Sequence, residues 1–567
     1  MSLPSNPRAV GISASIVPGA IFGAHLAALL WFLNPELPVA PGPMIRAALF
    51  YAGLGGVGSL ILLAPIWGGR RPGRALRLLP WLLSLVLLVD AGLYALQASH
   101  FAFYLPAGIN TRLLKAASWL GLGSLISMYT ALVHTWNRRP YGLRSRIGLW
   151  VVALGSLIVV VERREAYRPQ PEATSASAVG QPRNVTLFVV GLDGASPDAV
   201  LPLAEQGHLP FFDRILREGT LARLPPLDPS RTLPSWVTLA TGKLPFGHGI
   251  VGARVYEGAF LPTRSDLELL PAGLLLDRWG GLIAARTPDA SKRRARTLWE
   301  ILPRLGVPSG AVGWPSLTPT TAPLLFGFDD RFFQGEQTAA TSPQLRAPGT
   351  LFRVEERDLD TELLDQFPVS SRSVVSGSLA QDRWRSTLAL ALADRHPSLA
   401  ALFLRLPGLD RVSRLYFDGY AAHILEGRPG AGPQESLEVI RSYYRYLDGV
   451  LEQAWRLRDG PRLLVVVSPR GTRSAAPWHR LLRNRPPARQ DPEADGLLLV
   501  LGEGLRTGAF LAEVRPEDLV PTILYGLGLP LGRDLDGRVR TGAWEPAFVA
   551  RHPVAFIPSY DTLSEGE

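Results

Sequence analysis

The chain contains no cysteine and only three lysines among its 567 residues. The absence of cysteine excludes disulfides, thiolate metal ligands and cysteine nucleophiles, so a metal would need oxygen or nitrogen ligands. Arginine therefore carries almost all of the positive charge behind the formal net charge of +10. The arginines are scattered rather than gathered with aromatic residues, which argues against a nucleic-acid surface. We expect no nucleic-acid partner.

Acidic residues are nearly missing from the first 160 residues, where long apolar runs lie instead. Five runs are candidate membrane spans: Val10–Leu33, Met44–Trp67, Leu78–Ala98, Leu114–Trp136 and Leu143–Val161. A helix needs about 20 residues to cross a bilayer, so the first four are long enough and the fifth is short. Asp90 is the one carboxylate within them, which is a weak sign of function. A transporter or channel is disfavoured, because paired polar residues and broken-helix signs are missing.

The distribution of arginine predicts the topology of these spans. Arginines follow the second and fourth runs, at Arg70, Arg71, Arg74 and Arg77 and at Arg138, Arg139, Arg144 and Arg146, whereas residues 34–43 contain none. By the positive-inside rule the N-terminus and these clusters lie inside, and everything after Val161 lies outside. We expect a multi-pass protein of a bacterial cytoplasmic membrane, with a large periplasmic or extracellular C-terminal domain. A cleavable signal peptide is the competing interpretation of the first run, but four more runs follow it.

Composition divides the chain into four predicted parts. Residues 1–161 form a five-span transmembrane region, in which the glycines of "AGLGGVGS" are typical of helices that pack closely in lipid. Residues 162–184 are rich in Pro, Ser, Ala and charge, as linkers are. Residues 185–545 form the extracytoplasmic domain, and residues 546–567 a C-terminal tail.

The pattern of apolar and polar residues after Val185 predicts an α/β fold. Short apolar runs such as "VTLFVVG", "GVPSGAVGW", "SLAALFLRL", "PRLLVVVSP" and "GLLLVLG" are separated by helical patterns such as "LPFFDRILREG". This alternation is typical of a mainly parallel sheet with helices on both faces. Ligands of such folds gather at the carboxyl ends of the strands. The residues that directly follow each run are therefore the candidates for a site.

Two of these residues carry suitable chemistry. Asp193 follows the first strand in "GLDG", and Thr232 stands two residues before Pro234. Pro234–Thr241 has the pattern of a short helix closed by Gly242, because proline favours a first helical turn. The Thr232 hydroxyl either caps this helix or acts as a nucleophile, whose developing negative charge the helix dipole and a metal would stabilise.

Several motifs in order resemble the type I phosphodiesterase/nucleotide pyrophosphatase branch of the alkaline phosphatase superfamily. They are "VVGLDGASPD", "PSRTLPSWVTLATGKLPFGHGIVG", "RTLWEILPRLGVPSGAVGWPSLTP", "GLDRVSRLYFDGY", "YYRYLDGVL" and "DLVPTILYGLGLPLGRDLDGRV", and they span about residues 185–539. The resemblance implies an alkaline phosphatase-like fold. It also implies a site where two zinc ions assist a threonine or serine in attacking phosphorus.

The resemblance assigns the ligand positions, and several are substituted. Asp193 matches the first aspartate, Thr232 the nucleophile and Asp410 a second aspartate. Arg414 stands where the family has a histidine, four residues after that aspartate. Pro469 and Arg470 stand where it has an adjacent Asp-His pair.

The late histidine of the family pattern is missing too. The stretch "RPPARQDPEADG" contains none; His479 lies too far upstream, and Asp491 lies close to the expected position. Arginine cannot ligate zinc, because its guanidinium stays protonated. We therefore expect no cofactor, with Asp193 and Asp410 as remnant ligands and Thr232 as a vestigial nucleophile.

Two roles for the arginines stay open. Arg414 and Arg470 either neutralise the two aspartates as a salt-bridged plug or retain a pocket that binds an anion. The leading hypothesis is a membrane-anchored pseudoenzyme, a binding or assembly subunit with the lipid bilayer and a protein as partners. The alternative is an active phosphodiesterase, phosphatase or phosphotransferase that uses Thr232 with zinc or another divalent metal. That alternative needs a further ligand such as Asp491.

Two long stretches with poor periodicity interrupt the outer domain, Val251–Thr297 and Asp329 to about Arg372. The resemblance implies that insertions here cover the active site and select substrates. A protein-binding surface is an equal interpretation. His248, in "FGHGI", is expected to have a packing or turn role rather than a catalytic one.

Overall fold

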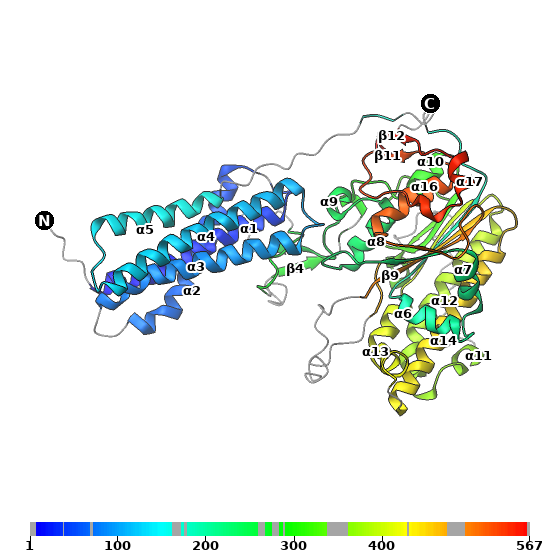
Figure 1. Cartoon of the computed structure of the whole chain (residues 1–567), viewed down its shortest axis with the longest axis horizontal. Coiled ribbons are helices and arrows are strands. Elements are labelled where there is room, and N and C mark those ends of the chain that lie inside the picture. The colour runs from blue at the N-terminus through cyan, green and yellow to red at the C-terminus, as the bar shows by residue number, and fades with distance from the viewer. Residues whose placement is uncertain are drawn as a thin grey trace. The chain divides into compact units, whose positions relative to one another are not determined.

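The computed structural model describes residues 7–37, 39–67, 72–160, 172–174, 179–258, 267–274, 283–286, 288, 290–336, 361–427, 430–472 and 494–563. The chain forms two compact units (Figure 1). The helical unit combines Met1–Pro169 with Val251–Pro288. The sheet unit combines Gln170–Ile250 with Asp289–Glu567.

The helical unit contains the long helices that the apolar runs predict. They are α1 (Pro7–Leu33), α2 (Pro41–Trp67), α3 (Pro72–His100) and α4 (Ala107–Trp136), followed by α5 (Leu143–Ser156) and the short helix η1 (Leu157–Val160). The first four contain segments long and apolar enough to cross a membrane. Helix α5 has 14 residues, about 21 Å against a hydrocarbon core of about 30 Å. The fifth span and the orientation of the bundle therefore stay predictions.

Glycines bring α1 and α2 into backbone contact. A Cβ atom added at Gly19 would lie 2.0 Å from the carbonyl oxygen of Gly55, and one at Gly23 would lie 2.0 Å from that of Tyr51. No side chain larger than hydrogen fits there, which is the packing that the glycine-rich run indicates. Large apolar side chains of α2 and α4, such as Leu62 and Leu125, point outward.

The helical unit also contains a part of the chain that was predicted within the outer domain. Strands β3 (Val255–Gly258) and β4 (Ile283–Arg286) form an antiparallel hairpin. Between them, Leu269 is fully buried in a core with residues of α1, α3 and α4. The division therefore differs from the predicted boundary at residue 162, because Leu269 packs against helices that end more than 130 residues earlier in the sequence.

The sheet unit is built on an eight-stranded sheet in the order β10-β2-β9-β8-β1-β7-β5-β6. The strands are β1 (Thr186–Leu192), β2 (Thr220–Leu224), β5 (Ser309–Trp314), β6 (Phe326–Asp329), β7 (Ala401–Leu406), β8 (Arg462–Ser468), β9 (Gly496–Gly502) and β10 (Ala509–Leu511). All neighbours are parallel except that β9 runs antiparallel to β2 and to β8. The predicted mainly parallel sheet is confirmed.

Helices cover both faces of this sheet (Figure 1). One core contains α6 (Pro197–Glu205), α7 (Pro210–Glu218), α12 (Arg372–Arg395), α13 (Gly408–Ile424) and α14 (Ala431–Arg456). The other contains α8 (Thr232–Thr241), α10 (Leu298–Arg304), α16 (Leu519–Gly526) and α17 (Pro546–Arg551). Along β1, Phe188 and Val190 enter the first core, whereas Leu187 and Val189 enter the second. This alternation follows from the two-residue period of a strand, and it confirms the fold class.

Residues 546–563, within the expected C-terminal tail, are part of the sheet unit. Besides α17 they include β12 (Phe556–Ile557), which pairs with β11 (Leu531–Gly532). Lys243, after α8, contacts the carboxylates of Asp534 at 2.5 Å and Asp561 at 2.6 Å. Buried apolar side chains such as Ile557 and this ion pair explain why the segment folds back.

Candidate functional site

The carboxyl ends of β1, β7 and β8 bring the two predicted aspartates together. Asp193 directly follows β1, Asp410 lies in the first turn of α13 after β7, and Arg470 lies two residues beyond β8. Strand β1 pairs with both β7 and β8, so these three ends are neighbours. Gly194 has a φ of +84°, and a Cβ there would lie 2.8 Å from the Cα of Asp410. Glycine is thus required for the two aspartates to approach.

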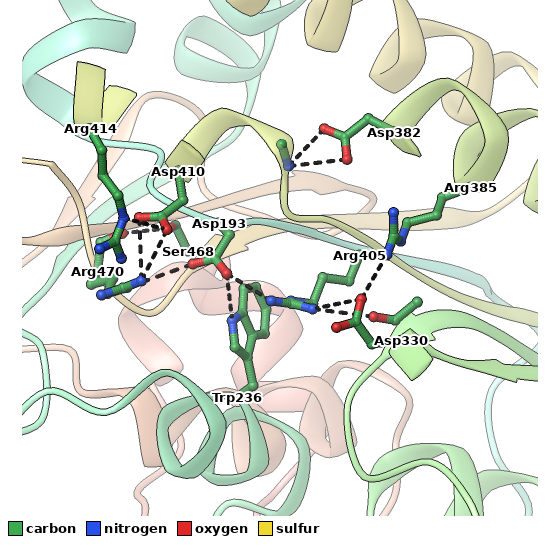
Figure 2. Close-up of polar contacts among 12 residues, drawn as sticks. Asp193, Trp236, Asp330, Asp382, Arg385, Arg405, Asp410, Arg414, Ser468 and Arg470 are labelled. Atoms are coloured by element: carbon green, nitrogen blue, oxygen red, sulfur yellow. Dashed lines mark hydrogen bonds and ion pairs between the residues drawn. The ribbon is translucent and has the colours of Figure 1, made fainter. Parts of the chain in front are cut away.

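Asp193 is buried and surrounded by cations (Figure 2). Arg405 donates to its Oδ2 at 2.7 Å, and the Trp236 indole donates to the same atom at 3.4 Å. Arg470 Nε lies 3.7 Å from Oδ1. Burial raises the pKa of this carboxyl, but the charges of Arg405 and Arg470 outweigh burial, so the pKa is lowered overall.

Asp410 is bound by the two arginines that stand at substituted ligand positions. Arg414 Nε, one helical turn later, donates to its Oδ2 at 3.0 Å, and a terminal nitrogen of Arg470 lies 3.3 Å from the same carboxylate. The Arg470 side chain is 7% exposed, whereas that of Arg414 is 55% exposed. Arg470 thus bridges Asp193 and Asp410 inside the protein, and Arg414 covers the pair from the surface.

The charged contacts continue beyond Arg405. A second nitrogen of Arg405 lies 3.5 Å from Asp330, which follows β6, and Arg385 of α12 contacts the same carboxylate at 2.8 Å. Together these residues form an alternating arginine–aspartate ladder along the carboxyl ends of the strands (Figure 2). Its members in order are Arg414, Asp410, Arg470, Asp193, Arg405, Asp330 and Arg385.

A fourth aspartate beside the ladder lies in a different environment. Asp382 is fully buried and accepts hydrogen bonds from the backbone N–H of Gly408 at 3.0 Å and from the Tyr443 hydroxyl at 2.9 Å. Burial raises its pKa to about 6, although the nearby Arg385 lowers it. This carboxyl anchors the start of α13, the helix that carries Asp410.

Thr232 begins α8, which starts two residues earlier than predicted and ends at Gly242 with a φ of +68°. The cap position at its start therefore belongs to Arg231, and no side chain caps this end. The expectation that Thr232 caps the helix is not supported.

His248 ends the short helix α9 (Pro245–His248), and Pro469 lies in a bend directly after β8. The Ile250 N–H donates to Nδ1 of the buried His248, whose Nε2 lies 3.1 Å from the Thr238 hydroxyl. Burial, with the charge of Arg293, lowers its pKa to about 3. Pro469 lies between β8 and Arg470, whose carbonyl accepts from the Ser468 hydroxyl at 2.6 Å. His479, Asp491 and much of the two long stretches lie outside the described residues.

Three members of the ladder are not predicted from the sequence: Arg405, Asp330 and Arg385. The signal for Arg405 was present, because it is the single charge in the apolar strand "ALFLRL". A charge in a fully covered strand requires a buried partner. Asp330 begins the 3-10 helix η5 (Asp330–Gln334) and Arg385 lies on α12, and their positions in the sequence carry no comparable signal.

Residues 187–490 match the family model described as Type I phosphodiesterase / nucleotide pyrophosphatase. The match covers more than half of the chain, and the chain belongs to this family. No curated protein matches it.

Several solved structures match part of this chain. Phosphonoacetate hydrolase from Sinorhizobium meliloti 1021 is 20% identical over 52% of this chain with a TM-score of 0.30, and the match spans 57% of that protein's length. Murine ectonucleotide pyrophosphatase / phosphodiesterase 5 is 13% identical over 62% of this chain and 97% of its own, with a TM-score of 0.35. A variant of the alkaline phosphatase PafA is 13% identical over 65% and 100%, with a TM-score of 0.39.

Proposed function

We propose that this family member is a membrane-anchored pseudoenzyme, a binding or assembly subunit that does not carry out metal-dependent hydrolysis. The observation that supports this proposal is the arginine–aspartate ladder. Asp193 and Asp410 stand where the family resemblance expects metal ligands, yet arginines contact both carboxylates. Their negative charge is compensated within the protein, and a divalent cation is not needed for that purpose.

The donor atoms around the two aspartates do not fit zinc. A guanidinium group stays protonated and offers no lone pair to a metal. The Arg470 side chain contacts both carboxylates, so a dication between them would face its positive charge at close range. Within the described residues, no group of three or more histidine, aspartate or glutamate side chains is placed to hold a metal. Structural and catalytic zinc sites need three or four such ligands.

The four long apolar helices support the proposal of a bilayer anchor. Large apolar side chains cover the outer surfaces of these helices, for example Leu49, Leu62 and Leu125. An apolar surface of this extent marks a membrane or protein contact. We propose that the sheet unit lies on the extracytoplasmic side, as the positions of the arginines predict, and that it binds a protein partner there.

Metal analysis of the full-length protein combined with activity assays tests the loss of catalysis. The protein is equilibrated with zinc or manganese, its bound metal is counted, and phosphodiester and phosphomonoester substrates are supplied. We expect less than one metal ion per chain and no turnover above that of the Thr232→Ala variant. Stoichiometric zinc together with turnover that disappears in Thr232→Ala would overturn the proposal.

A second candidate function is hydrolysis or transfer of a phosphate ester with Thr232 as nucleophile. One observation favours it: Oδ1 of Asp193 is buried and accepts no hydrogen bond within the described residues, which leaves an oxygen for another ligand. Thr232 also stands at the N-terminal end of α8, where the helix dipole stabilises negative charge. The same assays distinguish the two candidates.

A further inference from the structure

Two buried amide side chains of the helical unit contact the inserted part of the chain. Asn34 directly follows α1, and Gln97 lies in the last turn of α3. Asn34 is 3% exposed and Gln97 is fully buried. A buried amide without hydrogen-bond partners is costly, because it loses its contacts with water and gains none. Apart from the Leu30 carbonyl, to which Asn34 Nδ2 also donates at 2.9 Å, the hydrogen-bond partners of both side chains come from the segment Leu267–Ala272.

The two amides pair with the backbone of this segment. Asn34 Oδ1 accepts from the N–H groups of Glu268 at 2.7 Å and Leu269 at 2.9 Å, and its Nδ2 donates to the Leu269 carbonyl at 2.9 Å. Gln97 donates to the Ala272 carbonyl at 3.0 Å and accepts from the Ala272 N–H at 2.8 Å. Pairing with both backbone groups of one residue is what a neighbouring β-strand does.

Alternate side chains of the segment enter apolar cores of the helices. Leu269 is fully buried in a cluster that includes Leu33, Leu87 and Phe101. Leu267 is 6% exposed and lies in a second cluster with Trp31 and Met44. Backbone hydrogen bonds combined with pockets for alternate side chains are the usual way in which proteins bind an extended peptide.

The order of the units along the chain shows what this contact could hold together. Val251–Pro288 belongs to the helical unit, although sheet-unit sequence precedes and follows it. A single cut near residue 165 would separate helices α1 to α5 from the rest of the chain. The insertion would then hold the C-terminal piece to the helices without a covalent link.

We propose that the ends of α1 and α3 form a peptide-binding site whose ligand is this chain's own segment Leu267–Ala272. The segment is a second, non-covalent anchor of the outer domain, in addition to the linker. Asn34 and Gln97 are its recognition residues. The proposal does not depend on whether the outer domain hydrolyses a substrate.

Cleavage of the linker in the full-length protein tests the anchor. A recognition site for a sequence-specific protease is inserted between Glu165 and Ala166, and the chain carries an affinity tag at its N-terminus. After cleavage in detergent, we expect the C-terminal fragment to co-elute with the tagged helices. Excess synthetic peptide Asp266–Leu274 should release the fragment, whereas a peptide of the same composition in scrambled order should not.

Variants identify the residues responsible. Asn34→Ala combined with Gln97→Ala should abolish co-elution and speed amide hydrogen exchange at Glu268, Leu269 and Ala272. Asn137→Ala is the matched control, because the Asn137 amide donates to Val133 of its own helix α4, and it should leave co-elution unchanged. The proposal fails if the unsubstituted fragment separates on cleavage. It also fails if the fragment resists both the double substitution and the competing peptide. Should the double variant not fold, peptide release from the unsubstituted protein decides alone.

Discussion

Arg405 on β7 and Asp193, directly after the adjacent parallel strand β1, face each other, with a 2.7 Å hydrogen bond between two side chains that are 6% and 4% exposed. The guanidinium group of Arg405 also lies over the Trp236 ring, 4.9 Å from its centre. Strand register explains the pairing, because Arg405 is opposite Gly191 and Asp193 follows two residues later. A Cβ at Gly191 would lie 2.6 Å from the Trp236 ring, so only glycine at this position leaves enough space for the ring.

Removing one partner of this pair should be strongly destabilising. Arg405→Met leaves Asp193 buried with Arg470 Nε at 3.7 Å, and we expect a loss of about 3–5 kcal/mol in the free energy of unfolding. Urea unfolding followed by tryptophan fluorescence measures it. Adding Asp193→Asn should recover part of the loss, because the two side chains interact directly. Arg214→Met is the control, since its pair with Glu218 is exposed and should cost at most about 1 kcal/mol. Equal losses at Arg405 and Arg214 would contradict a dominant buried pair.

Reversing the substituted ligand positions should increase zinc binding. The combined variant Arg414→His, Pro469→Asp and Arg470→His restores the ligand types that the family resemblance expects and removes the cation between Asp193 and Asp410. We expect more zinc per chain than in the unsubstituted protein, measured by elemental analysis after dialysis. A variant with lysine at positions 414 and 470 keeps the charge and should bind no more zinc than the parent. Unchanged zinc in the combined variant would argue against the arginines as the cause.

Acidification should destabilise the protein through His248. Its folded-state pKa of about 3 lies below the ordinary value of 6.5, because burial and Arg293 disfavour the charged ring. The unfolded chain therefore binds the proton first, and stability falls as the pH decreases from about 6.5 toward 3. The full effect is about 5 kcal/mol. Urea unfolding at several pH values should show a shallower loss for His248→Gln, and identical slopes for both proteins would contradict this assignment.

Asp382 should make the protein less stable as the pH rises, which is the opposite of the effect of His248. Burial raises its folded-state pKa to about 6 from 3.8, so its contribution is full below pH 4 and is lost as the pH rises through 6. The shift corresponds to about 3 kcal/mol. In Asp382→Asn this part of the pH dependence should disappear from unfolding curves between pH 4 and 7. Asp213→Asn, at an exposed carboxylate, is the control. If Asp382→Asn kept the parent's slope of unfolding free energy against pH, Asp382 would not be the group responsible.

The contact of α1 with α2 should depend on individual glycines. A side chain at Gly55 would meet the backbone of Gly19, since even a Cβ would lie 2.1 Å from its carbonyl oxygen. Gly55→Val should therefore lower the melting temperature of the protein in detergent by several degrees. A Cβ at Gly58, one helical turn later, meets nothing within 4 Å. Gly58→Val should melt like the parent, and equal melting of the two variants would contradict close packing at Gly55.

The sequence predicted those features that local pattern determines. Continuous apolar runs identified β1, β5, β7, β8 and β9, because strands covered on both faces exclude polar residues. The order of motifs then located Asp193 and Asp410 at neighbouring strand ends, where the structure has them. Arg414 and Arg470 both contact Asp410, and the choice between a salt-bridged plug and an anion-binding pocket stays a prediction.

Other features depend on contacts that no local pattern reveals. Arg405 reaches Asp193 across strands more than 200 residues apart in sequence, so a partner could be inferred but not named. Leu267 and Leu269 look like loop residues because their apolar surroundings belong to distant helices, α1 and α2 for Leu267 and α1, α3 and α4 for Leu269. Helix α5 is too short for length to decide whether it spans.

The place of Val251–Pro288 within the helical unit limits how the protein can be shortened. A soluble version that simply begins at Gln170 would carry Leu267 and Leu269 without the helices that cover them, and exposed leucines promote aggregation. Deleting the insertion and closing the chain between Ile250 and Asp289 removes that liability. A shortened chain should therefore keep or remove the N-terminal helices and this distant stretch together.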